Sequence, residues 1–243
     1  MTVVADALSA PLRAGAEALG LQLSETQLGQ LLEFLALLQK WNQVYNLTAV
    51  RDPQEMLTHH LLDSLAAVAP LQRHLQGGAN LPGSAADGAQ LRLLDVGSGG
   101  GLPGVVFAIC CPALDVSCVD TVAKKAAFIQ QAAVSLRLRN LRGIHARVEN
   151  LAGPFDVVSC RAFASLPDFV TWSQAAIAPD GVWLAMKGRD PSDEIALLPP
   201  VAEVFHVEQL AVPGLDAERC IVWMRPRKNV EAGTDGVSGA ALP

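Results

Sequence analysis

The sequence predicts an α/β fold, in which a doubly wound, mainly parallel sheet of seven strands carries a helical extension at its N-terminus. From residue 91 onward, short apolar runs alternate with segments of helical periodicity, an order typical of a parallel sheet covered on both faces. Before residue 76, the apolar residues recur at helical spacing. The chain has 243 residues, of which 51% are apolar and 17% charged, so it can bury a large core and is not disordered.

The helical extension is expected over residues 1–75. A helix is predicted over 26–41, where leucine and aromatic residues recur at helical spacing, with Ser24 as its N-cap. A second helix is predicted over 59–71. Residues 76–90 are rich in Gly, Ala, Pro and Asp and lack periodicity, so we expect a flexible loop between the extension and the sheet.

The sheet domain is expected over residues 91–226, with strands and helices in alternation before a closing hairpin. The predicted strands are 91–96, 114–120, 141–146, 155–162 and 181–188, the helices are about 103–111, 122–136 and 166–177, and the hairpin joins 201–210 to 218–226. Residues 227–243 show no periodicity and are expected to be a disordered tail.

The composition excludes several classes of protein. The longest apolar run, residues 99–114, contains four glycines and two prolines and is shorter than the roughly 20 residues of a membrane-spanning helix. The chain begins without a secretory signal, so we expect a cytoplasmic protein with no membrane partner. The five cysteines lie in apolar segments and none has the spacing of a zinc site, so we expect buried thiols and no metal.

Charge is distributed unevenly along the chain, whose net charge is −6. Residues 121–161 carry seven basic and two acidic side chains, whereas the segments on either side are acidic. A local basic band can hold a phosphate backbone, which makes Lys124, Lys125, Arg137 and Arg139 candidate RNA-binding residues. The alternative is a solvated helix face, which is the reading that charge alone favours.

A glycine-rich turn, residues 97–104, follows the first predicted strand, where doubly wound sheets bind ligands. It matches the dinucleotide pattern G-x-G-x-x-G, a weak signal in so glycine-rich a stretch. Asp95 precedes the turn, and a carboxylate there disfavours a pyrophosphate but suits the ammonium and sulfonium of S-adenosylmethionine. The pattern D-x-G-x-G-x-G therefore favours S-adenosylmethionine over NAD, with Gly99 where the ligand approaches the backbone.

Residues at two further strand ends fit an adenosyl group. Asp120 ends the second predicted strand, where an acid accepts hydrogen bonds from both ribose hydroxyls. Its alternative role is to cap the next helix, and the two roles are compatible. Arg147, Val148 and Glu149 follow the third strand, where this fold frames an adenine; the alternative is a surface ion pair.

Seven motifs in this order and spacing support a family resemblance: WNQVYNLTAV, HHLLDSL, LLDVGSGGGLPG, VDTVAKKAAFI, RVEN, FDVVSCRAFASL and MKG. In these motifs, which run from Trp41 to Gly188, the chain resembles the ribosomal RNA small subunit methyltransferase G family, also called glucose-inhibited division protein B. The resemblance implies a Rossmann-like class I methyltransferase that methylates N7 of a guanine in 16S ribosomal RNA, with free 16S rRNA or the small ribosomal subunit as its partner. It places cofactor contacts at Gly97, Leu102, Val148, Glu149 and Arg161.

The chemistry implied by the resemblance agrees with the residues present. Guanine N7 has an in-plane lone pair and no proton to lose, so its methylation requires alignment and desolvation rather than a general base. No Ser/His/Asp set is evident in the chain, and the sequence assigns no catalytic residue. Arg161 ends the fourth strand and is the candidate for positioning, through a methionine carboxylate, a phosphate or guanine O6.

Rival interpretations remain open from the sequence. One is an S-adenosylmethionine-dependent methyltransferase that acts on a small molecule or on another RNA base. A pyrimidine is one such base, because Cys160 could attack its C6 atom, although a small apolar core residue suits that position as well. The others are an NAD-dependent oxidoreductase and a non-catalytic RNA-binding protein.

Overall fold

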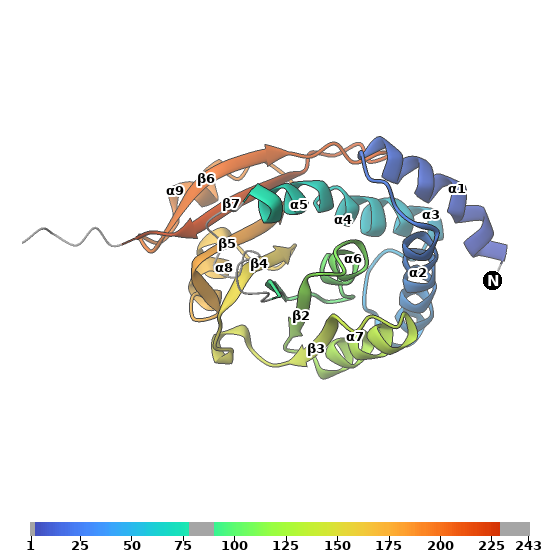
Figure 1. Ribbon diagram of the computed structural model, residues 1–243, viewed down its shortest axis with the longest axis horizontal. Helices are drawn as coiled ribbons and strands as arrows, with labels where there is room; N and C mark the ends of the chain where they lie inside the picture. Colours follow the sequence, from blue (N-terminus) through green and yellow to red (C-terminus); the bar gives the residue numbers. More distant parts are fainter. Residues whose placement is uncertain (1–2, 78–89, 229–243) are drawn as a thin grey trace, which may run out of the picture.

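Seven strands form the sheet of the computed structural model, which describes residues 3–77 and 90–228 (Figure 1). They are β1 (Arg92–Val96), β2 (Asp115–Asp120), β3 (Leu141–His145), β4 (Phe155–Arg161), β5 (Ile177–Lys187), β6 (Ala202–Gln209) and β7 (Cys220–Pro226). Their order across the sheet is β3-β2-β1-β4-β5-β7-β6. The first five pair in parallel, and β7 is antiparallel to β5 and β6. The predicted sheet and its closing hairpin are confirmed.

Helices cover both faces of this sheet because successive side chains of a strand point to opposite sides. Along β1, Leu93 belongs to the core on one face and Leu94 to the core on the other. The first face is covered by the N-terminal helices with α6 (Gly104–Cys110) and α7 (Ala123–Ser135), and the second by α8 (Leu166–Ser173). The other helices are α1 (Val3–Ala18), α2 (Glu25–Tyr45), α3 (Pro53–Met56), the π-helix η1 (Leu57–Leu62), α4 (Asp63–Leu65), α5 (Val68–Gly77), the 3-10 helix η2 (Val148–Asn150) and α9 (Ser192–Ala196).

Helix α2 joins the N-terminal extension to the sheet domain. Ser24 caps it as predicted: its Oγ accepts a hydrogen bond from Gln27 N at 3.2 Å, and Gln27 Oε1 accepts one from Ser24 N at 3.0 Å. Gln27 and Gln30 also donate to the backbone oxygens of Ile109 and Leu136, at the ends of α6 and α7. The buried side chains of the extension therefore share one core with the sheet.

Two helices of the extension differ from their prediction. Helix α2 continues to Tyr45, and the polar connection begins only at Asn46, whose left-handed backbone (φ 50°) ends the helix. The predicted helix 59–71 is a series of shorter helical segments that starts at Pro53 and includes η1. Asp52 caps this series by accepting hydrogen bonds from two backbone N–H groups, a start signal that the apolar periodicity did not reveal.

One predicted helix of the sheet domain is too long. It was expected to reach residue 177, but α8 ends at Ser173. Ile177 pairs instead with Phe155 and begins β5, because the edge of the parallel sheet offers this segment a strand partner. The short helix α9 was not predicted.

The predicted 76–90 loop and the C-terminal tail fall mostly outside the described residues. Gln76 and Gly77 belong to α5, while residues 78–89 and 229–243 are not described. Within the described ranges, none of the helices is long and apolar enough to cross a membrane.

Candidate functional site

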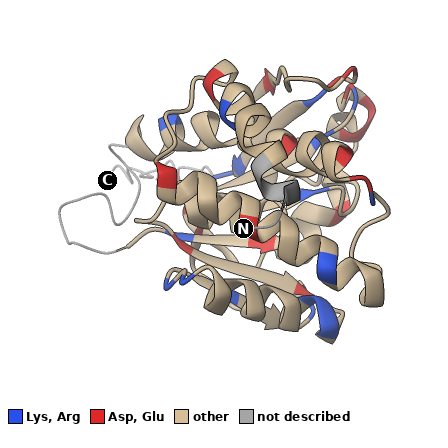
Figure 2. Cartoon of the chain, turned by 90° about the vertical axis from the view of Figure 1, so that its right-hand side faces the viewer, with Lys and Arg blue, Asp and Glu red and all other residues tan. Residues whose placement is uncertain are grey.

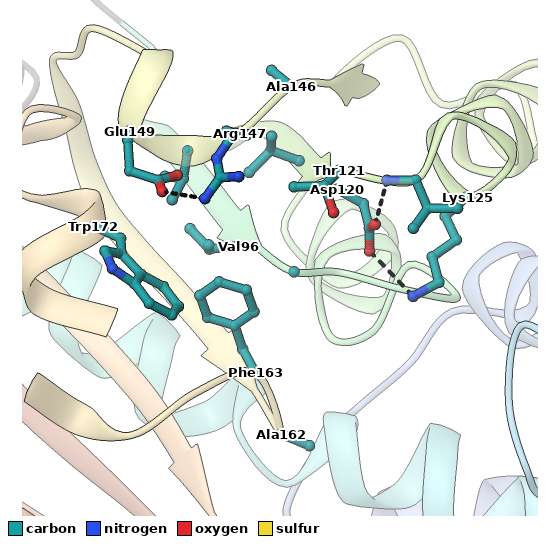
Figure 3. A pocket seen from close by; sticks show the side chains of 14 residues that line it. Val96, Asp120, Thr121, Lys125, Ala146, Arg147, Glu149, Ala162, Phe163 and Trp172 are labelled. Carbon is teal, nitrogen blue, oxygen red and sulfur yellow. Dashed lines mark hydrogen bonds and ion pairs between the residues drawn. The ribbon is translucent and has the colours of Figure 1, made fainter. Parts of the chain in front are cut away.

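A cavity of about 320 Å³ opens at the edge of the sheet where β1, β2, β3 and β4 end, and we name it the carboxyl-edge cavity (Figure 3). Doubly wound sheets bind their ligands at this edge. The loops that follow the four strands form its walls, and side chains from α7 and α8 complete them.

The glycine turn after β1 uses its backbone N–H groups within the protein. Gly99 N donates to Asp120 Oδ2 at 3.0 Å, and Gly104 N donates to Asp95 Oδ2 at 3.1 Å. Other N–H groups of the turn donate to backbone carbonyls. A pyrophosphate binds to such a turn through free N–H groups. NAD is therefore disfavoured because these N–H groups already have acceptors within the protein, which is a more direct reason than repulsion of the pyrophosphate by Asp95.

Gly97 allows an aromatic ring to lie against the turn. Its backbone is left-handed (φ 65°), and a Cβ atom at this position would lie 2.0 Å from Cδ2 of Phe163. The Phe163 ring projects into the cavity beside Trp172, with ring centroids 5.8 Å apart at an angle of 76° (Figure 3). Together the two rings form an aromatic wall suited to a planar heterocycle. Neither residue was singled out from the sequence: Phe163 lies in the motif FDVVSCRAFASL, and Trp172 lies in the helix predicted over 166–177.

Asp120 links the loops that follow β1 and β2, because its carboxylate accepts hydrogen bonds from backbone N–H groups in both. Its side chain is 6% exposed, and Oδ1 accepts a hydrogen bond from Val122 N at 2.9 Å at the start of α7. Lys125 Nζ lies 3.6 Å from Oδ2, which also accepts the bond from Gly99. A carboxylate offers about four acceptor positions. These contacts therefore leave room for a hydroxyl donor from the cavity, which Asp120 lines.

Asp95 contacts the glycine turn from the protein interior and does not line the carboxyl-edge cavity. It is completely buried, and its carboxylate accepts hydrogen bonds from Gly104 N and from Ser159 Oγ, at 3.1 and 3.0 Å. Burial raises the pKa of Asp95 to about 7. The acidic residue of the motif therefore positions the turn rather than meeting the ligand.

The charges that line the carboxyl-edge cavity balance one another. Arg147 Nη2 lies 3.1 Å from Glu149 Oε1, and Lys125 faces Asp120. Two cations and two anions thus surround an aromatic wall. This combination suits a ligand that carries charges of both signs and an aromatic base better than it suits a polyanion.

The structure separates the residues predicted to contact the cofactor into two groups. Those that line the carboxyl-edge cavity are Gly97, Asp120, Val148 and Glu149. Gly99 lies in the turn, where a Cβ atom would meet nothing closer than a backbone oxygen at 3.9 Å. Leu102 is 5% exposed and packs in the core, and Arg161 lines a different cavity.

That second cavity has a volume of about 490 Å³, and we name it the arginine cavity. Ala162, which follows β4 with a left-handed backbone (φ 50°), lines both cavities, so the two are neighbours across the end of this strand. The charged side chains of the arginine cavity are Asp63, Arg161, Lys187, Arg189, Glu194 and Arg219.

The basic segment 121–161 does not form one surface. Arg142 is paired with Asp115, and three further cations of the segment also have acidic partners. Lys124 lies over the exposed ring of Tyr45, 5.9 Å from its centroid. On the face seen in Figure 2, basic residues are interspersed with acidic ones.

Arg137 and Arg139 lie at the edge of the sheet opposite to the carboxyl-edge cavity. Helix α7 starts at the cavity and runs away from it, and both arginines follow its C-terminal end. Arg137 occupies the left-handed position (φ 57°) of the turn that ends α7, where Leu138 N donates to Ala133 O. Both side chains are exposed.

Cys160 is a core residue. It is 3% exposed and packs in the hydrophobic core on the α8 face of the sheet. Burial raises the pKa of its thiol, so it does not supply a thiolate. In the described part of the chain, no group of three or more His, Cys, Asp or Glu side chains is arranged to bind a metal ion.

Comparison with known proteins identifies close relatives. A family model described as rRNA small subunit methyltransferase G matches residues 27–222. A protein named ribosomal RNA small subunit methyltransferase G from Paracidovorax citrulli (strain AAC00-1) is 91% identical over 243 residues, which is the full length of both chains. A protein of the same name from Acidovorax ebreus (strain TPSY) is 73% identical over 93% of this chain and 99% of that protein.

Solved structures share the fold at low sequence identity. A 1,6-didemethyltoxoflavin-N1-methyltransferase from Burkholderia thailandensis, with bound 1,6-didemethyltoxoflavin and S-adenosylhomocysteine, has a TM-score of 0.53 and 18% identity over 81% of this chain and 90% of that one. A SAM dependent methyltransferase from Aquifex aeolicus has a TM-score of 0.50 and 13% identity over 78% of this chain and 97% of that one. At these identities the likeness concerns the fold alone.

Proposed function

Because the chain belongs to the rRNA small subunit methyltransferase G family, we propose that it transfers a methyl group from S-adenosylmethionine to N7 of a guanine in 16S rRNA. The substrate is 16S rRNA, free or within the small ribosomal subunit. The observation in the structure that carries this proposal is the carboxyl-edge cavity, which combines a glycine turn, a buried carboxylate at the end of β2 and an aromatic wall.

The residues of this cavity fit S-adenosylmethionine. Asp120 has acceptor positions left for the ribose hydroxyls, and Phe163 and Trp172 present ring faces or edges to an adenine. Val148 and Glu149 line the same end of the cavity. Gly99 and Leu102 contribute through the turn that they build. When bound, S-adenosylmethionine supplies an electrophilic methyl group on its sulfonium.

The chain needs no general base for this reaction, because guanine N7 attacks with a lone pair and has no proton to lose. Its contribution is to align the acceptor and to exclude water. Arg161 is the candidate for alignment, since it lines the arginine cavity directly beside Ala162. Asp63 neutralises much of its charge, which limits repulsion of the cationic product ring.

Methyl transfer to rRNA tests the proposal directly. The purified protein is incubated with tritiated S-adenosylmethionine and with 16S rRNA or small subunits from cells that lack it. We expect label in one guanine whose glycosidic bond becomes labile to borohydride and aniline. Label in another base, or transfer to small molecules but not to rRNA, contradicts the proposal.

Exchange of Cys160 for serine is expected to leave most of the activity. The thiol is buried in the core and a direct attack by N7 requires no covalent intermediate. Turnover within about threefold of wild type is expected, with a loss of stability of about 1 kcal/mol from the buried hydroxyl. An inactive Cys160→Ser variant that folds normally, together with covalent trapping by a fluoropyrimidine RNA, would show that the base is a pyrimidine.

Charge reversal at Arg137 and Arg139 tests their role as RNA-binding residues. Because they lie at the edge opposite to the carboxyl-edge cavity, any contact they make is with RNA remote from the target guanine. The double variant Arg137→Glu, Arg139→Glu is expected to raise KM for rRNA and flatten its salt dependence, with kcat and cofactor affinity unchanged. An unchanged KM would identify these arginines as a solvated face.

A further inference from the structure

The arginine cavity differs in charge from the neighbouring carboxyl-edge cavity. Its lining includes four basic and two acidic side chains, whereas the carboxyl-edge cavity has two of each. The chain as a whole has a net charge of −6, so this positive region runs against the overall balance. A concave positive region on an acidic protein attracts an anion and concentrates it there.

Asp63 lies at the centre of this charge pattern. Its Oδ2 accepts a hydrogen bond from Arg161 Nη1 at 2.6 Å, and its Oδ1 accepts one from Arg219 Nε at 2.9 Å. The exposed fractions of the side chains are 6% for Asp63, 17% for Arg161 and 21% for Arg219. One carboxylate therefore faces two largely buried guanidinium groups, and the cluster keeps an excess positive charge. Such a charge is costly unless an anion joins it.

Both guanidinium groups are fixed in orientation while part of each remains unused. Arg161 Nη1 also donates to His59 O at 2.8 Å, in the π-helical turn whose end is marked by the Asp63 N–H donating to Thr58 O and His60 O. Arg219 Nη1 donates to the preceding backbone carbonyl at 2.8 Å. Within residues 3–77 and 90–228, the Nη2 atom of neither arginine makes a hydrogen bond. Two oriented guanidinium groups with free N–H donors are suited to an oxyanion.

We propose that the arginine cavity binds a backbone phosphate of the acceptor RNA, with Arg161 and Arg219 as phosphate ligands and Asp63 as the residue that positions them. The inference rests on the proposed function, because the rRNA substrate provides the phosphate. A phosphate supplies the negative charge that the cluster lacks. Since Ala162 lines both cavities, this phosphate belongs to a nucleotide at or beside the methyl acceptor.

The variant Asp63→Asn distinguishes a positioning role of Asp63 from a purely electrostatic one, because the two roles predict opposite changes in rRNA affinity. It removes one negative charge, so electrostatics alone predicts tighter binding of rRNA. If Asp63 positions the arginines, the amide that replaces its carboxylate leaves one guanidinium group facing an N–H donor in place of an acceptor oxygen, and rRNA affinity falls by about tenfold. Affinity is measured by filter binding of 16S rRNA to the full-length protein. Glu203→Gln is the matched control, because it also removes a carboxylate paired with an arginine, Arg225, at 2.6 Å, but on the β6–β7 hairpin.

Arg219 variants test the phosphate contact without altering Asp63. Arg219→Ala is expected to lower rRNA affinity about tenfold and to reduce the slope of log affinity against log salt by about 0.7 to 0.9, the value of one phosphate contact. Arg219→Lys should restore the salt slope, because it keeps the charge. Neither change should alter binding of S-adenosylmethionine, since Arg219 does not line the carboxyl-edge cavity.

Three results would overturn the inference. They are an Asp63→Asn variant that folds and binds rRNA as tightly as wild type, an Arg219→Ala variant with an unchanged affinity, and an Arg219→Ala variant that loses affinity with an unchanged salt slope, which indicates a contact to a base. If Asp63→Asn fails to fold, the Arg219 measurements decide alone. A wild-type protein that binds 16S rRNA through Arg219 but does not methylate it refutes the proposed function and leaves this inference standing.

Discussion

Replacing Gly97 by alanine is expected to lower the affinity for S-adenosylmethionine by about 100-fold, on the order of 2.7 kcal/mol. The added Cβ atom would lie 2.0 Å from the Phe163 ring, and a side chain is strained at φ 65°. Phe163 must therefore leave the aromatic wall or the glycine turn must shift. Both changes alter the carboxyl-edge cavity. Titration calorimetry with S-adenosylmethionine measures the loss, and circular dichroism checks that the sheet remains folded.

Gly99→Ala is the matched control for this prediction. Gly99 shares the left-handed backbone (φ 55°), so the strain is similar, but its Cβ atom would meet only a backbone oxygen at 3.9 Å. Its N–H bond to Asp120 is retained. We expect a loss in affinity of less than about tenfold, from strain alone. If Gly99→Ala is as damaging as Gly97→Ala, the ligand lies against Gly99, as the sequence pattern predicts, and the steric role of Phe163 is minor.

The contribution of Asp95 to stability should fall as the pH rises from about 4 to about 7. Burial raises the pKa of this carboxyl from 3.8 to about 7 in the folded protein. Between these values the folded state keeps a proton that the unfolded chain has released, so increasing pH favours unfolding. Above pH 7 the contribution of this group is constant. The full penalty is on the order of 4 kcal/mol.

The variant Asp95→Asn should remove this penalty. An asparagine can accept the hydrogen bond from Gly104 N through its carbonyl and donate through its amide to Ser159 Oγ, so the geometry of the buried site is preserved. We expect Asp95→Asn to be more stable than wild type at pH 8 and similar to it at pH 4, as measured by urea unfolding. Asp156→Asn serves as the control, since its carboxylate accepts a hydrogen bond from Arg92 N at the other end of β1. A pH dependence of stability that is the same in Asp95→Asn and in wild type would show that Asp95 does not contribute to it.

Local signals in the chain are sufficient to predict the architecture. Apolar residues such as Leu93, Leu94 and Val96 and the helical spacing before Trp41 show which face of each element is buried, because burial repeats with the period of the element. The Ser24 cap and the glycine turn after β1 are equally local. The ends of the elements were less predictable. Ile177 belongs to β5 and not to the preceding helix, because it pairs with Phe155 of the neighbouring strand β4.

Part of the site was predictable for the same reason. In a parallel sheet, residues that follow successive strands meet at one edge, so Gly97, Asp120, Val148 and Glu149 were brought together by topology alone. Whether each side chain faces the cavity or the protein interior was not predictable in this way. Asp95 and Leu102 belong to the same motif but point into the protein, where one supports the turn and the other packs in the core.

Which charged side chains form ion pairs depends on how the elements pack against one another. Arg161 and Arg219 are far apart in the sequence, and both bond to Asp63, which comes from the N-terminal extension. Seven basic residues of segment 121–161, close together in the sequence, are dispersed because α7 carries Arg137 and Arg139 to the opposite edge of the sheet. Periodicity records the environment of each residue along its own element, but an ion pair depends on two elements and the packing between them. A pattern within one element therefore cannot predict which charged side chains of two different elements come within ion-pair distance.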